Sequence, residues 1–119
     1  MCEDDLSVLL DGMVVSIQLV QERFSKIQEA DDFVGSSEGV TLLDAISMRL
    51  QVIGELVKQI HQIAPNYLAA YKEIDWNKIA RFRDFVSHHY EQIDYEIVYD
   101  ICKNHIPKLY QVVQKMRHT

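Results

Sequence analysis

The eight residues from Arg83 to Tyr90 concentrate side chains that can handle phosphate, and we call them the motif run. Arg83 presents a planar guanidinium whose fork matches phosphate oxygens. His88 and His89 can donate or accept a proton near neutral pH. Cleaving RNA without a metal requires a base for the 2′-hydroxyl proton, an acid for the leaving 5′-oxygen and a cation for the charge on phosphorus. Histidine and arginine together could supply all three roles.

A regular helix would not bring these groups to one point. His88 lies five positions after Arg83, which places the two side chains about 140° apart around an ideal helix. Either the helix ends or distorts near His88, or two copies of the chain meet and share one cleft. The alternative is that these residues have a structural role alone, with Arg83 buried and paired with Asp84 or Glu55. In that case two partly exposed histidines would lie near a helix C-terminus, where a positive charge is favourable.

Size and composition predict one domain. The chain has 119 residues and is 48% hydrophobic, which is enough for one packed core over residues 1–119 and too little for two. No run approaches the roughly eighteen apolar residues of a membrane span, and the acidic start is unlike a signal peptide. We therefore expect a cytoplasmic protein without membrane contact. Cys2 and Cys102 form no metal-binding pattern, and we expect both to be reduced thiols.

Charge is distributed unevenly along the chain, whose formal net charge is -6. Residues 1–60 contain eleven acids and four bases, whereas residues 61–119 contain seven acids, eight bases and all five histidines. A polyanion would therefore meet the second half of the chain.

The first half predicts two long helices. Apolar residues recur at steps of three and four over residues 4–27, the period of one helix face. Residues 29–39 are polar, contain two glycines and read as a surface loop. Thr41 could cap the second helix, with Asp44 at the acidic position of a capping box. That helix should run to about residue 63.

Two features of the second helix and its end carry further predictions. Gly54 lies inside the helix, where it costs roughly 1 kcal/mol relative to alanine, so we expect a neighbouring helix to cross closely there. Arg49 falls within the apolar stripe and should extend its charged end to the surface. Pro65 ends the helical pattern, and residues 66–73 predict one short helical stretch.

The second half predicts two more helices. Asp75 is a suitable cap for a third helix that starts at Trp76 and continues through the motif run. Its apolar side should consist of Ile79, Phe82 and Val86, with Arg83 and Tyr90 on the same side. A last helical region over residues 94–115 should be kinked or divided at Pro107. These elements predict an all-α fold, an antiparallel up-and-down bundle of four to five helices.

The motif run and its context resemble the HepT-like branch of the HEPN ribonucleases. That branch typically shows a tryptophan, then arginine and a polar residue, then histidine, any residue and tyrosine. Here these are Trp76, Arg83, Asp84, His88 and Tyr90, with the spacing reproduced. The segment from Ile53 to Glu55 and the proline at 107 also resemble the branch, so the similarity covers nearly the whole chain.

The resemblance implies a homodimer in which the motif runs of both subunits face one another across a cleft. His88 would be the general base or acid at the ribose, Arg83 would hold the scissile phosphate, and Asp84 would orient Arg83. Neither metal nor cofactor would be needed. The substrate would be single-stranded or tRNA-like RNA, cut to a 2′,3′-cyclic phosphate or 3′-phosphate and a 5′-hydroxyl.

The resemblance also implies regulation by a partner. Tyr90 matches a tyrosine to which, in HepT toxins, an antitoxin of the minimal nucleotidyltransferase kind attaches AMP. The added nucleotide would block the cleft and silence the toxin.

Three residues around the motif run are candidate substrate contacts: Lys78, Arg81 and His89. Arg81 could instead pair with His88 at a longer spacing, or His89 could replace His88, but Tyr90 favours His88. The chain departs from the branch at Asp84, which is most often asparagine there. A carboxylate at this position could neutralise Arg83 and weaken its hold on phosphate.

Three functions are compatible with the sequence. The first is a metal-independent RNA endonuclease that acts as the toxin of a toxin–antitoxin pair. The second is a non-catalytic subunit that binds nucleotide or substrate for a nucleotidyltransferase. The third is a structural helical dimer whose polar residues specify the interface.

Overall fold

The computed structural model describes the backbone of residues 2–89 and 92–118, and the side chains of this range except those of 2–4, 85, 87–89 and 92. Most of this backbone is helical, and two very short strands form the one sheet that it contains. In chain order the elements are α1 (Cys2–Phe24), η1 (Ala30–Phe33), α2 (Ser37–Ile63), η2 (Leu68–Ala70), α3 (Trp76–Ala80), α4 (Phe82–Val86), β1 (Ser87–His89), β2 (Gln92–Ile93), α5 (Tyr95–Asp100), η3 (Ile101–His105) and α6 (Ile106–Arg117).

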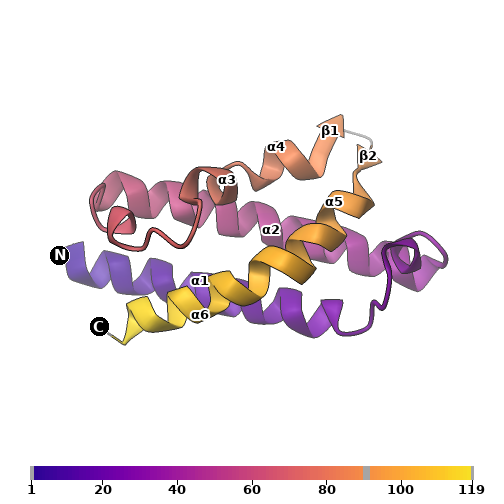
Figure 1. Ribbon diagram of the computed structural model, residues 1–119, viewed down its shortest axis with the longest axis horizontal. Coiled ribbons are helices and arrows are strands. Elements are labelled where there is room, and N and C mark those ends of the chain that lie inside the picture. The colour runs from indigo at the N-terminus through magenta and orange to yellow at the C-terminus, as the bar shows by residue number, and fades with distance from the viewer. Residues whose placement is uncertain (1, 90–91, 119) are drawn as a thin grey trace.

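The long helices α1 and α2 form an antiparallel pair at the centre of the bundle. Helices α3 and α4 pack along α2, and α6 packs along α1 (Figure 1). One continuous apolar core joins all of these helices. The predicted helical bundle is therefore confirmed. Its fully buried side chains include Met13, Ile17, Phe33, Ile46, Leu50, Ile53, Phe82, Ile101, Ile106 and Leu109.

The predicted start of the second helix at Thr41 is wrong, because α2 begins one turn earlier. Ser36 is the N-cap, and its hydroxyl oxygen accepts a hydrogen bond of 2.9 Å from the backbone N–H of Gly39. The hydroxyl of Thr41 donates to the carbonyl oxygen of Ser37 at 3.1 Å, within the helix. Gly39 is buried, and a side chain there would clash with the backbone of Asp32. Glycine thus serves close packing here, where the sequence suggested only a surface loop.

The preceding segment is also more ordered than the predicted loop. It contains η1, which Glu29 and Asp32 stabilise through a capping box. The Asp32 carboxylate accepts hydrogen bonds from the backbone N–H groups of Gln28 at 2.8 Å and Glu29 at 3.1 Å. These backbone hydrogen bonds lower the pKa of Asp32. Phe33, fully buried, anchors the turn to the core.

The close helix crossing predicted at Gly54 is confirmed. A Cβ atom at this position would lie 3.0 Å from the carbonyl oxygen of Ile79 and 3.2 Å from that of Ala80. Both oxygens belong to the backbone of α3, which cannot rotate away as a side chain can. Gly54 therefore sets how near α3 lies to α2.

A pair of alanine substitutions tests this role. We expect Gly12→Ala to stabilise the fold by about 0.5–1 kcal/mol, since alanine favours a helix and the new methyl would meet only the flexible Leu56 side chain, at 3.5 Å. Gly54→Ala should instead lower the free energy of unfolding, because its methyl presses on the α3 backbone. Urea unfolding of both variants measures the difference. Equal stabilisation by the two substitutions would contradict the close crossing.

The last helical region follows the prediction with one addition. Asp94 caps α5, and its side chain accepts a hydrogen bond from the backbone N–H of Ile97 at 3.1 Å. A π-helical turn, η3, joins α5 to α6, and Pro107 occupies the first turn of α6. Proline lacks the N–H that a continuous α-helix would need, so the wider turn directly before it accommodates the loss.

Cys102 is a free, buried thiol, as predicted for this residue, while the Cys2 side chain lies outside the described residues. Burial raises the pKa of Cys102 to about 12. In a Cys2→Ser variant at pH 8, we expect Cys102 to react with a thiol reagent about a thousandfold more slowly than in the unfolded chain, because thiolate is the reactive form. Equal rates in the native and urea-unfolded protein would contradict this burial.

Candidate active site

The start of α3 is held by two side chains. The Asp75 carboxylate accepts a hydrogen bond from the backbone N–H of Lys78 at 3.1 Å, as predicted for an N-cap. The indole N–H of Trp76 donates to the carbonyl oxygen of Tyr71 at 3.0 Å. These bonds fix the start of α3, the helix that precedes the motif run.

The single helix predicted from Trp76 through the motif run is wrong. Helix α3 ends at Ala80, Arg81 forms a tight turn, and α4 begins at Phe82. The backbone N–H of Arg81 is shared between the carbonyl oxygens of Asn77 and Lys78, each at 3.2 Å. The predicted apolar side is nevertheless correct, since Ile79, Phe82 and Val86 are all buried. Core packing by these three residues survives the break in the helix.

Arg83 is exposed, so its predicted place on the buried side, and the alternative of a buried ion pair, are both wrong. It directly follows the fully buried Phe82, and the next residue on a helix points away from the core. Asp84 is exposed as well and lies 3.9 Å from the guanidinium of Arg81, while Glu55 pairs with Lys58. Among the described contacts Arg83 has neither carboxylate as a partner.

The chain leaves the helix immediately after Val86. Strand β1 pairs antiparallel with β2, Ser87 opposite Ile93, and the backbone N–H of Asp94 donates to the carbonyl oxygen of Val86 at 2.9 Å. His88 therefore lies in extended backbone, and the 140° separation expected on one helix does not apply. This small hairpin was missed because such a short pair has no alternating pattern.

The remaining predicted site residues divide into two groups. Lys78 is half-buried on α3 and Arg81 is exposed at the turn, both next to the motif run. The side chains of His88 and His89, and all of Tyr90, lie outside the described residues.

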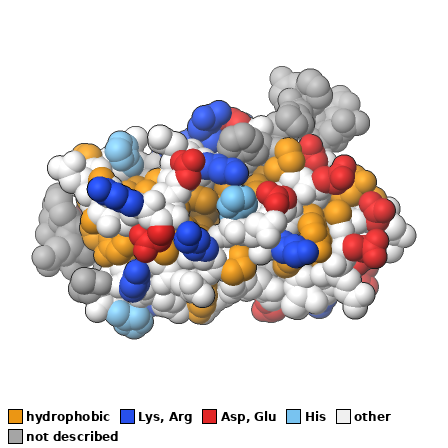
Figure 2. All heavy atoms as spheres, viewed as in Figure 1, with side chains coloured by type: hydrophobic (Ala, Val, Ile, Leu, Met, Phe, Trp, Pro, Cys, Tyr) orange, Lys and Arg blue, Asp and Glu red, His pale blue; other side chains and the backbone are white. Residues whose placement is uncertain are grey.

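Charge separates along the molecule. Figure 2 shows acidic side chains gathered at the end that holds η1 and the start of α2, whereas Lys and Arg side chains, mixed with further acidic ones, lie over the middle and the opposite end. At the acidic end the hydroxyl of Tyr95 donates to Asp31 at 3.3 Å. The pKa of Tyr95 is raised, mainly by the negative charge of Asp31. A polyanion is thus repelled from this end.

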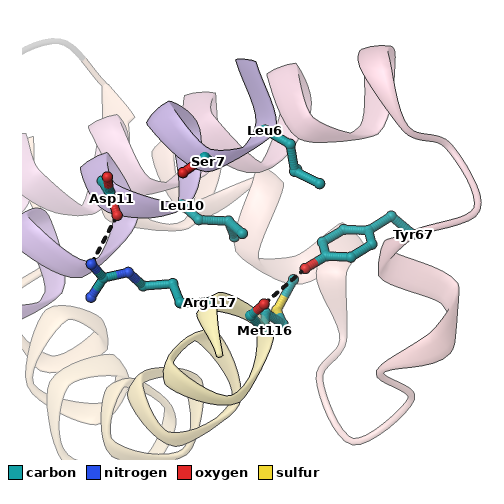
Figure 3. A pocket seen from close by; sticks show the side chains of 7 residues that line it. All are labelled: Leu6, Ser7, Leu10, Asp11, Tyr67, Met116 and Arg117. Carbon is teal, nitrogen blue, oxygen red and sulfur yellow. Dashed lines mark hydrogen bonds and ion pairs between the residues drawn. The ribbon is translucent and has the colours of Figure 1, made fainter. Parts of the chain in front are cut away.

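A cavity of about 550 Å³ opens at the end of the bundle where both chain ends lie, away from β1 (Figures 1 and 3). An ion pair of 2.9 Å between Asp11 and Arg117 borders it, and the hydroxyl of Tyr67 donates to the carbonyl oxygen of Met116 at 3.4 Å. The sequence did not point to this cavity, because its lining residues come from the start, the middle and the end of the chain. Asp11, Arg117 and Tyr67 in its lining thus already have partners within the protein.

Within residues 2–89 and 92–118, no helix is long and apolar enough to cross a membrane. Among the side chains that the structure describes, no three of His, Cys, Asp or Glu gather closely enough to hold a metal ion.

Comparison with known proteins gives a family. The profile of the family described as "Ribonuclease HepT-like" matches residues 13–116, which include the whole motif run. No solved structure matches the chain.

Relatives with curated descriptions agree with the family match. A protein of Methanocaldococcus jannaschii described as "Gamma-glutamylcyclotransferase and putative RNase" is 30% identical over 94% of this chain and 47% of its own length. A second protein of that organism, a "Putative RNase", is 40% identical over 53% of this chain and 50% of its own length. The chain thus spans about half the length of these two relatives. The "Probable ribonuclease HepT" of Thermococcus cleftensis is 29% identical over 91% of this chain and 92% of its own length. The chain therefore belongs to the HepT-like ribonuclease family.

Proposed function

We propose that the protein is a metal-independent endoribonuclease whose site is built on Arg83 and His88. The observation that carries the proposal is an exposed Arg83 at the arginine position of a motif whose family the chain shares. Its side chain extends from a helix that Phe82 and Val86 anchor in the core. A cation held on a rigid element is already in position when a phosphate binds, so the protein need not rearrange.

The reaction follows from the chemistry of the two groups. One histidine takes the proton of the ribose 2′-hydroxyl, whose oxygen attacks phosphorus. The P–O5′ bond breaks, the 5′-oxygen receives a proton from an acid, and a 2′,3′-cyclic phosphate remains. Arg83 stabilises the charge that grows on the non-bridging oxygens during the attack.

Asp84 is less of an obstacle to this chemistry than the sequence suggested. Its nearest described cation is Arg81, at 3.9 Å, and both side chains are more than half exposed. Solvent screens such a pair, so the Asp84 charge should weaken phosphate binding at Arg83 only modestly. We expect Asp84→Asn to change the cleavage rate by less than about tenfold, whereas a hundredfold gain would show that Asp84 restrains the site.

We further propose that two subunits share each site. Mixed dimers of Arg83→Ala and His88→Ala subunits test this, since a shared site would leave one Arg83 and one His88 facing each other. Such dimers should regain RNA cleavage that neither parent variant shows. Inactive mixed dimers, with both subunits folded, would show that each subunit's site is self-contained.

As a toxin, the protein would be silenced by AMP attached to Tyr90 by a cognate minimal nucleotidyltransferase. We expect such an enzyme and ATP to add one AMP mass to the protein, detected by mass spectrometry, and to stop cleavage. The Tyr90→Phe variant should gain no AMP mass, and it should still cleave RNA in the presence of the nucleotidyltransferase and ATP. Modification that persists in Tyr90→Phe would assign the switch to another residue.

The direct test of the function is cleavage of single-stranded RNA and tRNA in EDTA. Cleavage should persist without metal and be lost in His88→Ala. Undiminished cleavage by His88→Ala combined with Arg83→Ala would contradict the proposal, as would tight nucleotide binding by a protein that cuts no RNA.

A further inference from the structure

A second cavity, of about 290 Å³, lies between the end of α2, η2 and α3. In Figure 1, α3 runs beside α2, and the segment with η2 turns back near the C-terminal end of α2. The floor of the cavity is apolar and firm, since Val57 and Leu68 are buried at 2% and 3% exposure. Its size is at the lower limit of small-molecule sites, which suits a single ring system rather than a peptide segment.

Trp76 supplies an aromatic wall to this cavity. Its indole N–H is already bonded to the carbonyl oxygen of Tyr71 at 3.0 Å, so the side chain offers the cavity only ring surface. The same bond and the Asp75 cap hold the ring in place. A fixed aromatic surface favours a planar partner, because stacking then costs little conformational entropy.

The rim of the cavity carries polar groups that lack partners. The side chains of His61 and Asn77 line it, are exposed, and make no hydrogen bond or ion pair within the described part of the chain. Lys58, also on the rim, pairs with Glu55 at 3.4 Å, with both side chains about half exposed. Amide and imidazole groups bond to base edges, and a screened lysine can contact phosphate.

The cavity adjoins the helix that precedes the proposed site. Ala80 lines it at the end of α3, and Arg83 follows three residues later in α4. Trp76 and Arg83 lie on two consecutive short helices, α3 and α4, with only Arg81 between the helices, so a strand of a few nucleotides could contact both residues. Helices α3 and α4 both pack against α2, which also lines the cavity, so the cavity and Arg83 share one supporting helix.

From these observations we infer that the cavity between α2, η2 and α3 binds a nucleobase of single-stranded RNA, close to the phosphate held at Arg83. The inference rests on the proposed ribonuclease function and deepens it. Trp76 stacks on the base, and His61 and Asn77 contact its edge.

Trp76 is the single tryptophan of the chain, so its fluorescence reports on the cavity directly. The probe is a 2′-O-methyl oligoadenylate hexamer, which cannot be cleaved because its 2′-oxygens are blocked. Its titration should change the fluorescence and saturate, whereas an abasic hexamer with the same backbone should not. AMP alone should give the same change at higher concentration, because it lacks the neighbouring phosphates.

Kinetics separate this site from the catalytic one. His61→Ala and Asn77→Ala should each raise KM for RNA about 2- to 10-fold, with kcat unchanged, since each removes a hydrogen bond made in both ground and transition states. Trp76→Leu should raise KM about 5- to 100-fold, and Trp76→Phe should retain part of the stacking. His118→Ala, an exposed histidine outside the cavity lining, is the matched control and should leave KM unchanged.

The outcomes distinguish this inference from the proposed function. RNA cleavage with no change in Trp76 fluorescence, and with native KM for both rim variants, would overturn the base site and leave the ribonuclease intact. Quenching by the hexamer in a protein that cuts no RNA would support the base site and refute the ribonuclease. An equal response to the abasic hexamer would contradict base recognition.

Discussion

Replacing Arg83 by alanine is expected to reduce kcat/KM for RNA cleavage by about 10²- to 10³-fold, the usual loss when one charged stabiliser of a transition state is removed. The fold should not change, because the side chain is exposed and has no described partner. Single-turnover cleavage in EDTA measures the effect, since it reports on chemistry rather than product release.

Two variants sharpen the interpretation of this loss. Arg83→Lys keeps the charge but not the planar fork, so it should recover only part of the rate. Lys108→Ala removes an exposed cation outside the motif run. Its kcat/KM should stay within about threefold of the native value, because only the general attraction between the protein and RNA is weakened. A similar decrease for Lys108→Ala and Arg83→Ala would reduce the role of Arg83 to nonspecific attraction.

Replacing Phe82 by alanine is expected to have the largest effect on stability. Phe82 is fully buried and is the first residue of α4. Such a truncation costs about 3–5 kcal/mol through lost burial and the cavity that remains. It should lower the melting temperature by more than about 10 °C. Cleavage should fall too, even where the protein stays folded, because α4 then positions Arg83 less firmly.

Phe82→Leu is the matched control, because it keeps most of the buried volume. It should cost less than half as much as Phe82→Ala and preserve cleavage. Native-like cleavage by a folded Phe82→Ala protein would show that the position of Arg83 does not depend on this anchor.

The sequence predicted the helices well wherever periodicity was strong. The stripes of α1 and α2 and the cap at Asp75 are in place, since these signals depend on neighbouring residues alone. Errors arose where tertiary packing decided the outcome. Helix α2 starts at Ser37 rather than at Thr41, because buried Gly39 packs against the turn around Asp32.

The candidate site was predictable in its residue types but not in its geometry. Spacing identified Arg83, yet a helical wheel placed it on the buried side, because the break at Arg81 changes the direction of the helix. The cavity beside Trp76 could not be predicted, since its walls come from three elements that only the fold brings together. Periodicity reports one face of one helix and gives no information on such assemblies.

Identifying the chemical ends of cleaved RNA is the most direct test of the account. In EDTA, the native protein should leave a 2′,3′-cyclic phosphate or 3′-phosphate on one fragment and a 5′-hydroxyl on the other, because the 2′-oxygen is the proposed nucleophile. His88→Ala should give neither fragment. Fragments with a 5′-phosphate and a free 3′-hydroxyl, or cleavage that stops when metal is removed, would contradict a site built on Arg83 and His88.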